Sequence, residues 1–96
     1  MIVRRISYTE KPGSDMMEWV YGSSQKVRAV DGMRKAEFLK SKTTPGEWAA
    51  FMYFNTQKDL DTYKKSGPYK DIIKSMADYV DMNMPIKDEV FECLEV

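Results

Sequence analysis

One stretch of the chain, from Trp48 to Phe54, reads WAAFMYF and contains only apolar and aromatic residues. In a β-strand, successive side chains point to opposite faces of the sheet. One face would carry Trp48, Ala50, Met52 and Phe54, and the other would carry Ala49, Phe51 and Tyr53. Both faces of the sheet that holds this strand therefore need apolar cover.

The length of the chain limits what can provide this cover. Its 96 residues are enough for one domain with one hydrophobic core, so we expect a single domain over residues 1–96. Hydrophobic residues make up 43% of the chain and charged residues 31%, as is usual for a soluble globular protein. No apolar run approaches the roughly 20 residues that cross a membrane. A second layer over the sheet must come from another molecule.

Charge and residue usage exclude several classes of function. The 15 basic residues balance the 15 acidic ones and are scattered, so nucleic acid is not an expected partner. There is no histidine, which excludes histidine-ligated zinc or haem and any Ser-His or Cys-His nucleophile pair. No acidic cluster supports a carboxylate-only metal site, and we expect neither a metal nor a cofactor. The charged N-terminal residues and the single cysteine indicate a cytoplasmic protein.

Turn and cap signals divide the first half of the chain. Residues 2–8 read as a strand that ends before a Pro-Gly turn. Asp15, with Glu18 three residues later, predicts the start of a helix that should end near Gly32. Residues 33–42 alternate between apolar and charged side chains and carry enough lysine to suit a strand near a sheet edge. A second Pro-Gly pair, typical of a type II turn, joins this strand to WAAFMYF as a hairpin.

The second half of the chain predicts a divided helix and a last strand. Thr56 is a helix cap, and Pro68 interrupts the helix because proline lacks a backbone donor. We expect the second piece to begin with Pro68 in its first turn. Residues 90–96 alternate as a strand that contains Cys93, which we expect to be a buried, unreactive thiol.

This order of elements predicts an α+β fold of the ferredoxin-like βαββαβ type, with four antiparallel strands and helices on one face. On the other face, Phe51, Tyr53 and Leu39 would be exposed to water. Burying one large apolar side chain stabilises a fold by roughly 1.5–3 kcal/mol, so their exposure would forfeit several kcal/mol. The net stability of a small domain is only about 5–15 kcal/mol. We therefore expect a homodimer in which two sheets meet face to face.

Three segments resemble the antibiotic biosynthesis monooxygenase domain of the dimeric α+β barrel superfamily. They span almost the whole chain and read EKPGSDMMEW, GMRKAEFLKSKTTPGEWAAFMYF and FNTQKDLDTYKKSGPYKDI. The resemblance implies a homodimer, a dimeric α+β barrel, with a cavity between sheet and helices in each subunit. Members include cofactor-independent monooxygenases acting on polycyclic aromatics, and haem-degrading enzymes. Where haem degraders carry a tryptophan, this chain has Phe54, and their haem-ligating histidine has no counterpart around Ser66 to Lys70. Haem degradation is therefore not expected. Haem binding would require Tyr or Met as the iron ligand.

Oxygenation without a cofactor needs an electron-rich substrate, usually an aromatic anion, because side chains activate oxygen poorly. Either Arg4 or Arg5, whichever points inward, could pair with this anion, and a solvent-facing or inter-subunit arginine is the competing interpretation. Tyr53, Tyr63 and Tyr69 could orient the substrate, or could simply pack in the core. With an ordinary pKa near 10, a tyrosine is a poor base at neutral pH.

A pocket for such a substrate would be mostly apolar with a few polar groups. The residues that we expect to line it are Trp19, Trp48, Met52, Phe54 and Asn55. The aromatic residues among them suit a core equally well, and Asn55 suits a turn at the strand end. Gly22, Ser23 and Ser24 on the first helix are small enough to leave space above the sheet, and close approach of the helix to the sheet would explain them equally well. The leading hypothesis is a cofactor-free monooxygenase, and the alternative is a non-catalytic small-molecule-binding or stress-related module.

Overall fold

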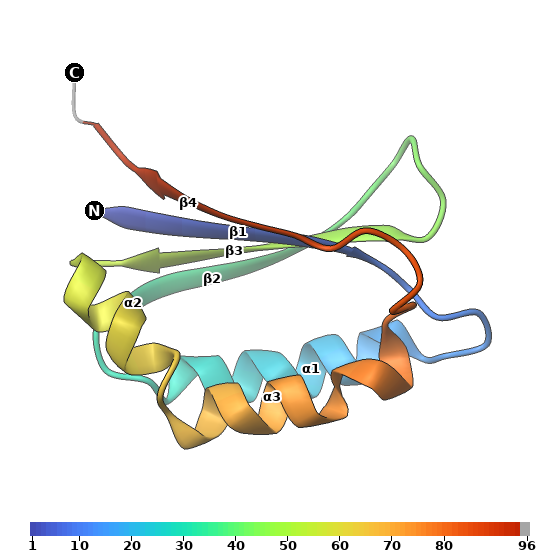
Figure 1. Ribbon diagram of the computed structural model, residues 1–96, viewed down its shortest axis with the longest axis horizontal. Helices are drawn as coiled ribbons and strands as arrows, with labels where there is room; N and C mark the ends of the chain where they lie inside the picture. Colours follow the sequence, from blue (N-terminus) through green and yellow to red (C-terminus); the bar gives the residue numbers. More distant parts are fainter. Residues whose placement is uncertain (95–96) are drawn as a thin grey trace.

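The computed structural model describes residues 1–94, and within them a four-stranded antiparallel sheet carries helices on one face (Figure 1). The elements are β1 (Ile2–Thr9), α1 (Met16–Arg28), β2 (Met33–Lys40), β3 (Glu47–Phe54), α2 (Gln57–Tyr63), α3 (Gly67–Tyr79) and β4 (Lys87–Glu92). The strand order is β2-β3-β1-β4, so β2 lies at an edge as predicted. The predicted ferredoxin-like α+β fold is confirmed. None of these helices combines the length and the apolar character needed to cross a bilayer.

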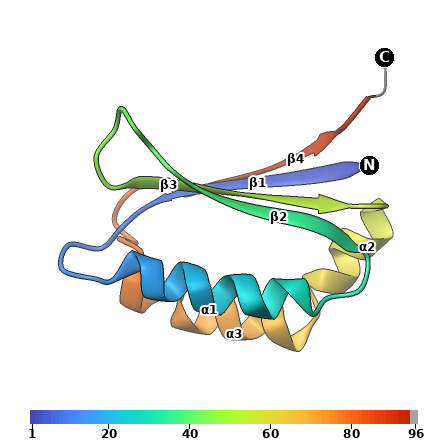
Figure 2. The ribbon, with the colours of Figure 1, turned by 180° about the vertical axis from the view of Figure 1, so that it is seen from behind.

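The central strand β3 has the two faces that its sequence predicts. Trp48, Ala50, Met52 and Phe54 are buried, with exposed fractions of 0–5%. Ala49, Phe51 and Tyr53 alternate with them and are half-buried. Both views show α1 and α3 on the same side of the sheet, which we call its inner face (Figures 1 and 2). No element among residues 1–94 covers the other side, the outer face.

Helix α1 begins where it was predicted but ends earlier. The side chain of Asp15 accepts a hydrogen bond from the backbone nitrogen of Glu18 at 3.2 Å, which caps the first turn. The helix ends at Arg28 and not near Gly32. Gly32 does have a left-handed φ of +85°, but in the turn that leads into β2. Its missing side chain lets the backbone approach Asp59, so a tertiary contact and not a helix cap explains this glycine.

The predicted division of the second helix is confirmed. Thr56 caps α2, and Ser66 caps α3, whose first turn contains a proline. The break places Tyr63 at the end of α2 and Tyr69 at the start of α3. Their ring centroids lie 5.2 Å apart in an edge-to-face arrangement. A local sequence signal thus brings two tyrosines together beneath the sheet.

The last strand begins three residues before its predicted start. β4 spans Lys87–Glu92. Hydrogen-bonded pairing with β1 sets these bounds, whereas the prediction relied on the apolar alternation within the segment itself. Cys93 follows the strand and is exposed, so the prediction of a buried thiol is wrong. Positions 95 and 96 of the predicted strand lie outside the described residues.

The two glycines Gly32 and Gly22 provide a matched test of this packing. Gly32→Ala is expected to lower the free energy of unfolding by about 1–2 kcal/mol or more, because a left-handed φ disfavours any side chain and the new Cβ would lie 2.5 Å from Asp59 Cγ. In α1, a Cβ at Gly22 meets nothing within 4 Å, and Gly22→Ala should stabilise by about 1 kcal/mol. Urea unfolding measures both, and an unchanged midpoint for Gly32→Ala would contradict the close approach to Asp59.

Candidate functional site

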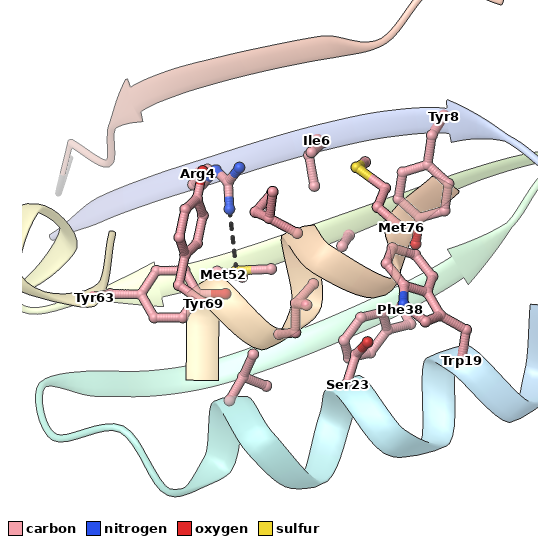
Figure 3. A pocket seen from close by; sticks show the side chains of 14 residues that line it. Arg4, Ile6, Tyr8, Trp19, Ser23, Phe38, Met52, Tyr63, Tyr69 and Met76 are labelled. Carbon is pink, nitrogen blue, oxygen red and sulfur yellow. Dashed lines mark hydrogen bonds between the residues drawn. The ribbon is translucent and has the colours of Figure 1, made fainter. Parts of the chain in front are cut away.

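A cavity lies between the inner face of the sheet and the helices (Figure 3). Its lining is almost entirely apolar and comes from β1, β2, β3 and all three helices. The space open to the centres of water molecules is about 30 Å³, enough for roughly two waters. A larger ligand therefore requires lining side chains to move. Met52 and Met76 have flexible side chains, and Ile73 on α3 is 44% exposed.

The charged residue in this lining is Arg4 of β1, which is only 3% exposed. Its Nε and Nη2 donate hydrogen bonds to the two carboxylate oxygens of Asp88, at 2.9 and 2.8 Å. Its Nη1 faces the sulfur of Met52 at 3.9 Å, and its Cζ lies 5.6 Å from the ring centre of Tyr69. The dashed line in Figure 3 marks this weak sulfur contact. Nη1 is therefore the guanidinium nitrogen best placed to exchange its partner for a ligand.

The strand register explains why Asp88 reaches Arg4. β1 and β4 are antiparallel, with Ile6 opposite Asp88 and Arg4 opposite Val90. Residues two apart on a strand share a face, so Arg4 and Asp88 are diagonal neighbours, within reach of a long side chain. A planar guanidinium and a carboxylate then make the two-bond arrangement that arginine favours.

Each partner of this pair keeps the other ionised. Burial opposes the charge of Arg4, but the hydrogen bond and the negative charge of Asp88 outweigh it and raise the pKa of Arg4. The hydrogen bond from Arg4 in turn lowers the pKa of Asp88, although partial burial opposes this. The two charges cancel at neutral pH. The cavity thus offers a directional donor with little net charge.

Tyr63 and Tyr69 lie below Arg4 in Figure 3. Burial raises the pKa of Tyr63 to about 12, while the nearby guanidinium partly counteracts this effect. Tyr63 therefore stays protonated at neutral pH and can donate a hydrogen bond, but it cannot act as a base. Tyr69 is half-buried, with its ring between Tyr63 and the arginine. This end of the cavity combines three groups that the sequence proposed as site residues.

The structure brings together five of the predicted site residues, namely Arg4, Tyr63, Tyr69, Trp19 and Met52. Trp19 donates its indole N–H to Ser75 Oγ at 2.9 Å, so its ring offers the cavity an apolar surface. Of the three small residues singled out on α1, Ser23 lines the cavity and is 5% exposed, whereas Gly22 and Ser24 are not part of the lining.

Two predicted catalytic residues, Arg5 and Tyr53, lie on the outer face. The Tyr53 hydroxyl donates to Glu37 at 2.8 Å, and Arg5 forms a loose ion pair with Glu89 at 3.9 Å. Strand alternation is the reason, because Arg5 follows inward-pointing Arg4 and Tyr53 follows inward-pointing Met52. Neither residue lines the cavity, contrary to the prediction for Tyr53. Of the two arginine alternatives, Arg4 is the one that points inward.

Three predicted pocket residues also lie elsewhere. Phe54 is fully buried, with its ring centre 5.6 Å from that of Tyr63. Trp48 lies at the opposite end of β3, where its ring faces the ammonium of Lys40 at 5.6 Å. Asn55 is exposed and accepts a hydrogen bond from Arg34 at 3.2 Å. The competing interpretations therefore describe these residues better: Phe54 and Trp48 pack in the core, and Asn55 lies at the turn after β3.

Sequence reasoning missed Asp88 and Tyr8. Asp88 precedes the predicted last strand, residues 90–96, and only the pairing of β4 with β1 reveals its place. Tyr8 could have been found, because it has the same parity as Arg4 on one strand and must share its face. Among residues 1–94, no three His, Cys, Asp or Glu side chains come together in a way that could hold a metal ion.

Asp88→Asn tests the ion pair. Losing one charge-assisted partner should lower the free energy of unfolding near neutral pH by about 1–3 kcal/mol, and the partial exposure of Asp88 favours the lower end. Because the folded-state pKa of Asp88 lies below its unfolded value near 3.8, the contribution is fully present above that value. It is lost as the pH falls through the folded-state pKa.

Urea unfolding from neutral pH to well below pH 3.8, the unfolded-state pKa of Asp88, measures this effect. The curves of Asp88→Asn and the natural protein should converge at the acid end. Asp78→Asn, a change at an exposed carboxylate on α3, is the control and should stay within about 0.5 kcal/mol of the natural protein. A gap that persists undiminished in acid would contradict the ion-pair account.

Comparison with known proteins identifies the fold through structure. No protein-family model and no curated protein matches the sequence. Rv0793 from Mycobacterium tuberculosis superposes with a TM-score of 0.83 at 18% identity, covering 99% of this chain and 96% of that one. A Nitrosomonas europaea protein named "putative antibiotic biosynthesis monooxygenase" gives 0.81 at 20% identity, covering 99% and 100%. SnoaB, a cofactor-independent oxygenase from Streptomyces nogalater solved as a mutant, gives 0.80 at 6% identity, covering 99% and 94%.

Identities this low establish the fold and not the activity. The resemblance found in the sequence is confirmed at that level: this chain has the fold of proteins named antibiotic biosynthesis monooxygenases.

Proposed function

We propose that the protein is a cofactor-independent monooxygenase that binds a small aromatic substrate, as an anion, in the cavity beside Arg4. The observation that carries this proposal is the placement of one buried guanidinium nitrogen, Arg4 Nη1, in a mostly apolar cavity. A charged group in such surroundings is costly and is often found where a site needs it. The fold shared with SnoaB, a cofactor-independent oxygenase, supports the same reaction class.

Each residue at this end of the cavity has a role in the proposal. Arg4 Nη1 binds the oxygen of an ionised aromatic hydroxyl, leaving its two bonds to Asp88 in place. Tyr63 donates a second hydrogen bond, which its raised pKa permits. Tyr69 packs its ring against the substrate. The apolar lining excludes water, and this strengthens the polar contacts inside.

The substrate itself must supply the electrons. A ring CH₂ group beside an ionised hydroxyl can react with O₂ so that one oxygen atom forms a carbonyl and the other leaves as water. The carbon gives up four electrons and O₂ accepts them, which balances the reaction without a separate reductant. The protein then needs only to stabilise the anion and exclude water, which are tasks that ordinary side chains perform.

A non-catalytic binding module is the second candidate. It is favoured by the pairing of Arg4 with Asp88, which cancels most of the charge that would stabilise an anion. A cavity with a neutralised donor suits an uncharged ligand with an oxygen acceptor at least as well. In this case the same residues bind a small molecule and no oxygen is consumed.

We also propose that the protein works as a homodimer through its outer face. Leu39 of β2 and Phe91 of β4 are 45% and 48% exposed there, and Phe51 lies half-buried between them. These side chains belong to one uncovered sheet surface, and a second copy presents the same surface. Sheet-to-sheet contact would supply the cover that β3 requires on both sides.

Oxygen consumption tests the enzymatic proposal. With a panel of hydroxylated polycyclic aromatics that carry a ring CH₂ group, under air, the natural protein should consume O₂ and release an oxidised product. Arg4→Met should reduce kcat/KM by roughly 10²-fold, the usual cost of removing a group that stabilises a developing oxyanion. Product formation is followed by mass spectrometry with ¹⁸O₂, which should place one labelled atom in the product.

Arg5→Met is the matched control, since Arg5 is the next residue on β1 but points to the outer face. It should keep its activity, provided that sedimentation shows an unchanged assembly. Saturable binding without oxygen uptake across the panel would contradict the monooxygenase and support the binding module. Equal loss in both arginine variants would contradict a specific role for Arg4.

Sedimentation velocity tests the dimer. The double variant Leu39→Glu and Phe91→Glu should sediment as a folded monomer, because it places two charges on each side of the proposed interface. The control is Met17→Glu with Tyr21→Glu, which changes two residues of α1 that are 50% and 67% exposed. The control should stay dimeric. A natural protein that sediments as a monomer at micromolar concentration would contradict the proposal.

A further inference from the structure

The far end of the cavity contains a buried hydroxyl without a partner. Tyr8 follows Arg4 by four positions on β1, shares its face, and is 3% exposed. Its hydroxyl oxygen has no hydrogen-bond partner among the described residues. Figure 3 shows the Tyr8 ring reaching from the sheet toward the helical layer, beside Trp19 and Met76.

The neighbours of Tyr8 do not satisfy this hydroxyl. The ring of Trp19 stands edge-on to it, with centroids 5.5 Å apart, and the indole N–H of Trp19 is committed to Ser75 at 2.9 Å. Burial raises the pKa of Tyr8, so the hydroxyl keeps its proton. Buried polar groups in folded proteins are nearly always paired, and the exceptions call for an explanation. Here the unpaired group is a donor in the wall of a cavity.

The two polar ends of the cavity are well separated. Four residues of extended strand place the Cα atoms of Arg4 and Tyr8 about 13 Å apart. Apolar side chains line the wall between them, including Ile6, Ala50 and Ile72. Ser23 of α1 lies below, with its hydroxyl on the cavity side of the helix in Figure 3. The lining is thus polar at one end, apolar in the middle and polar again at the other end.

We infer that the cavity binds an elongated ligand whose apolar body carries an oxygen at each end, one held by Arg4 and the other accepting a hydrogen bond from the Tyr8 hydroxyl. This inference rests on the proposed ligand site. It makes Tyr8 a specificity-determining residue. A ligand with an apolar far end gains no hydrogen bond from this donor and should therefore bind more weakly than one with an acceptor there.

Two probes of nearly equal size test the far end. 6-Methoxy-2-naphthol carries an acceptor oxygen at the position where 6-ethyl-2-naphthol carries a methylene, and both keep the hydroxyl for Arg4. Titration calorimetry should show the methoxy probe binding roughly 3–10-fold more tightly, the value of one net hydrogen bond. In Tyr8→Phe the ratio of the two dissociation constants should fall to about one, through weaker binding of the methoxy probe.

Two other tyrosine variants are controls. Tyr63→Phe, at the Arg4 end, should weaken both probes and preserve their ratio. Tyr21→Phe, on the exposed side of α1, should change neither affinity. Equal binding of the two probes to the natural protein would overturn the second polar end and leave the ligand site itself intact. No binding of either probe would overturn both the ligand site and this inference.

Thermal unfolding of the ligand-free protein gives an independent measurement. Tyr8→Phe removes an unpaired hydroxyl, so its Tm should equal or exceed that of the natural protein. A fall of several degrees would show that the hydroxyl is already bonded in the empty protein, for example to a buried water. That result would overturn the inference, because the donor would not be free for a ligand.

Discussion

The burial of one face of β1 and β3 against the helices is the constraint on which the rest of the structure depends. These two strands occupy the centre of the sheet, and alternation lets only every second residue reach the cavity. The same wall of the cavity therefore contains residues of both strands, namely Arg4, Ile6 and Tyr8 from β1 and Ala50 and Met52 from β3. The chemistry of the cavity is fixed by the parity of positions on two strands, with α1 and α3 closing it from below.

The ion pair of Arg4 and Asp88 shows how a charge can persist in this lining. A fully buried ion pair is costly because both charges lose their water. Asp88 sits on the edge strand β4 and remains 37% exposed, so only one partner is strongly desolvated. The guanidinium is held in place while Nη1 keeps a weak sulfur contact. The same arrangement that stabilises Arg4 also reduces the positive charge that it can offer, so the two proposed functions differ in whether the ligand must be an anion.

Local signals predicted the elements well, because caps and turns act within a few residues. Asp15, Thr56 and the proline in the first turn of α3 all act as their sequence indicates. The end of α1 and the start of β4 were misplaced, since both depend on tertiary neighbours. Alternation separated Tyr53 from Met52 correctly and placed Phe51 and Tyr53 on the face that the helices leave uncovered, although Tyr53 was also proposed as a cavity residue. The sequence did not show which residues of β1 share the covered face, so the choice between Arg4 and Arg5 stayed open.

The sequence by itself determined the order of strands and helices, the two-sided character of β3 and the break that brings Tyr63 near Tyr69. Each of these follows from propensity or periodicity within one segment. Only the tertiary structure decided which face of β1 lines the cavity, that Asp88 would pair with Arg4, and that the Tyr8 hydroxyl would be left unpaired. These properties arise from contacts between residues far apart in the chain. Strand register and helix placement determine such contacts, and the chemistry of a single segment does not.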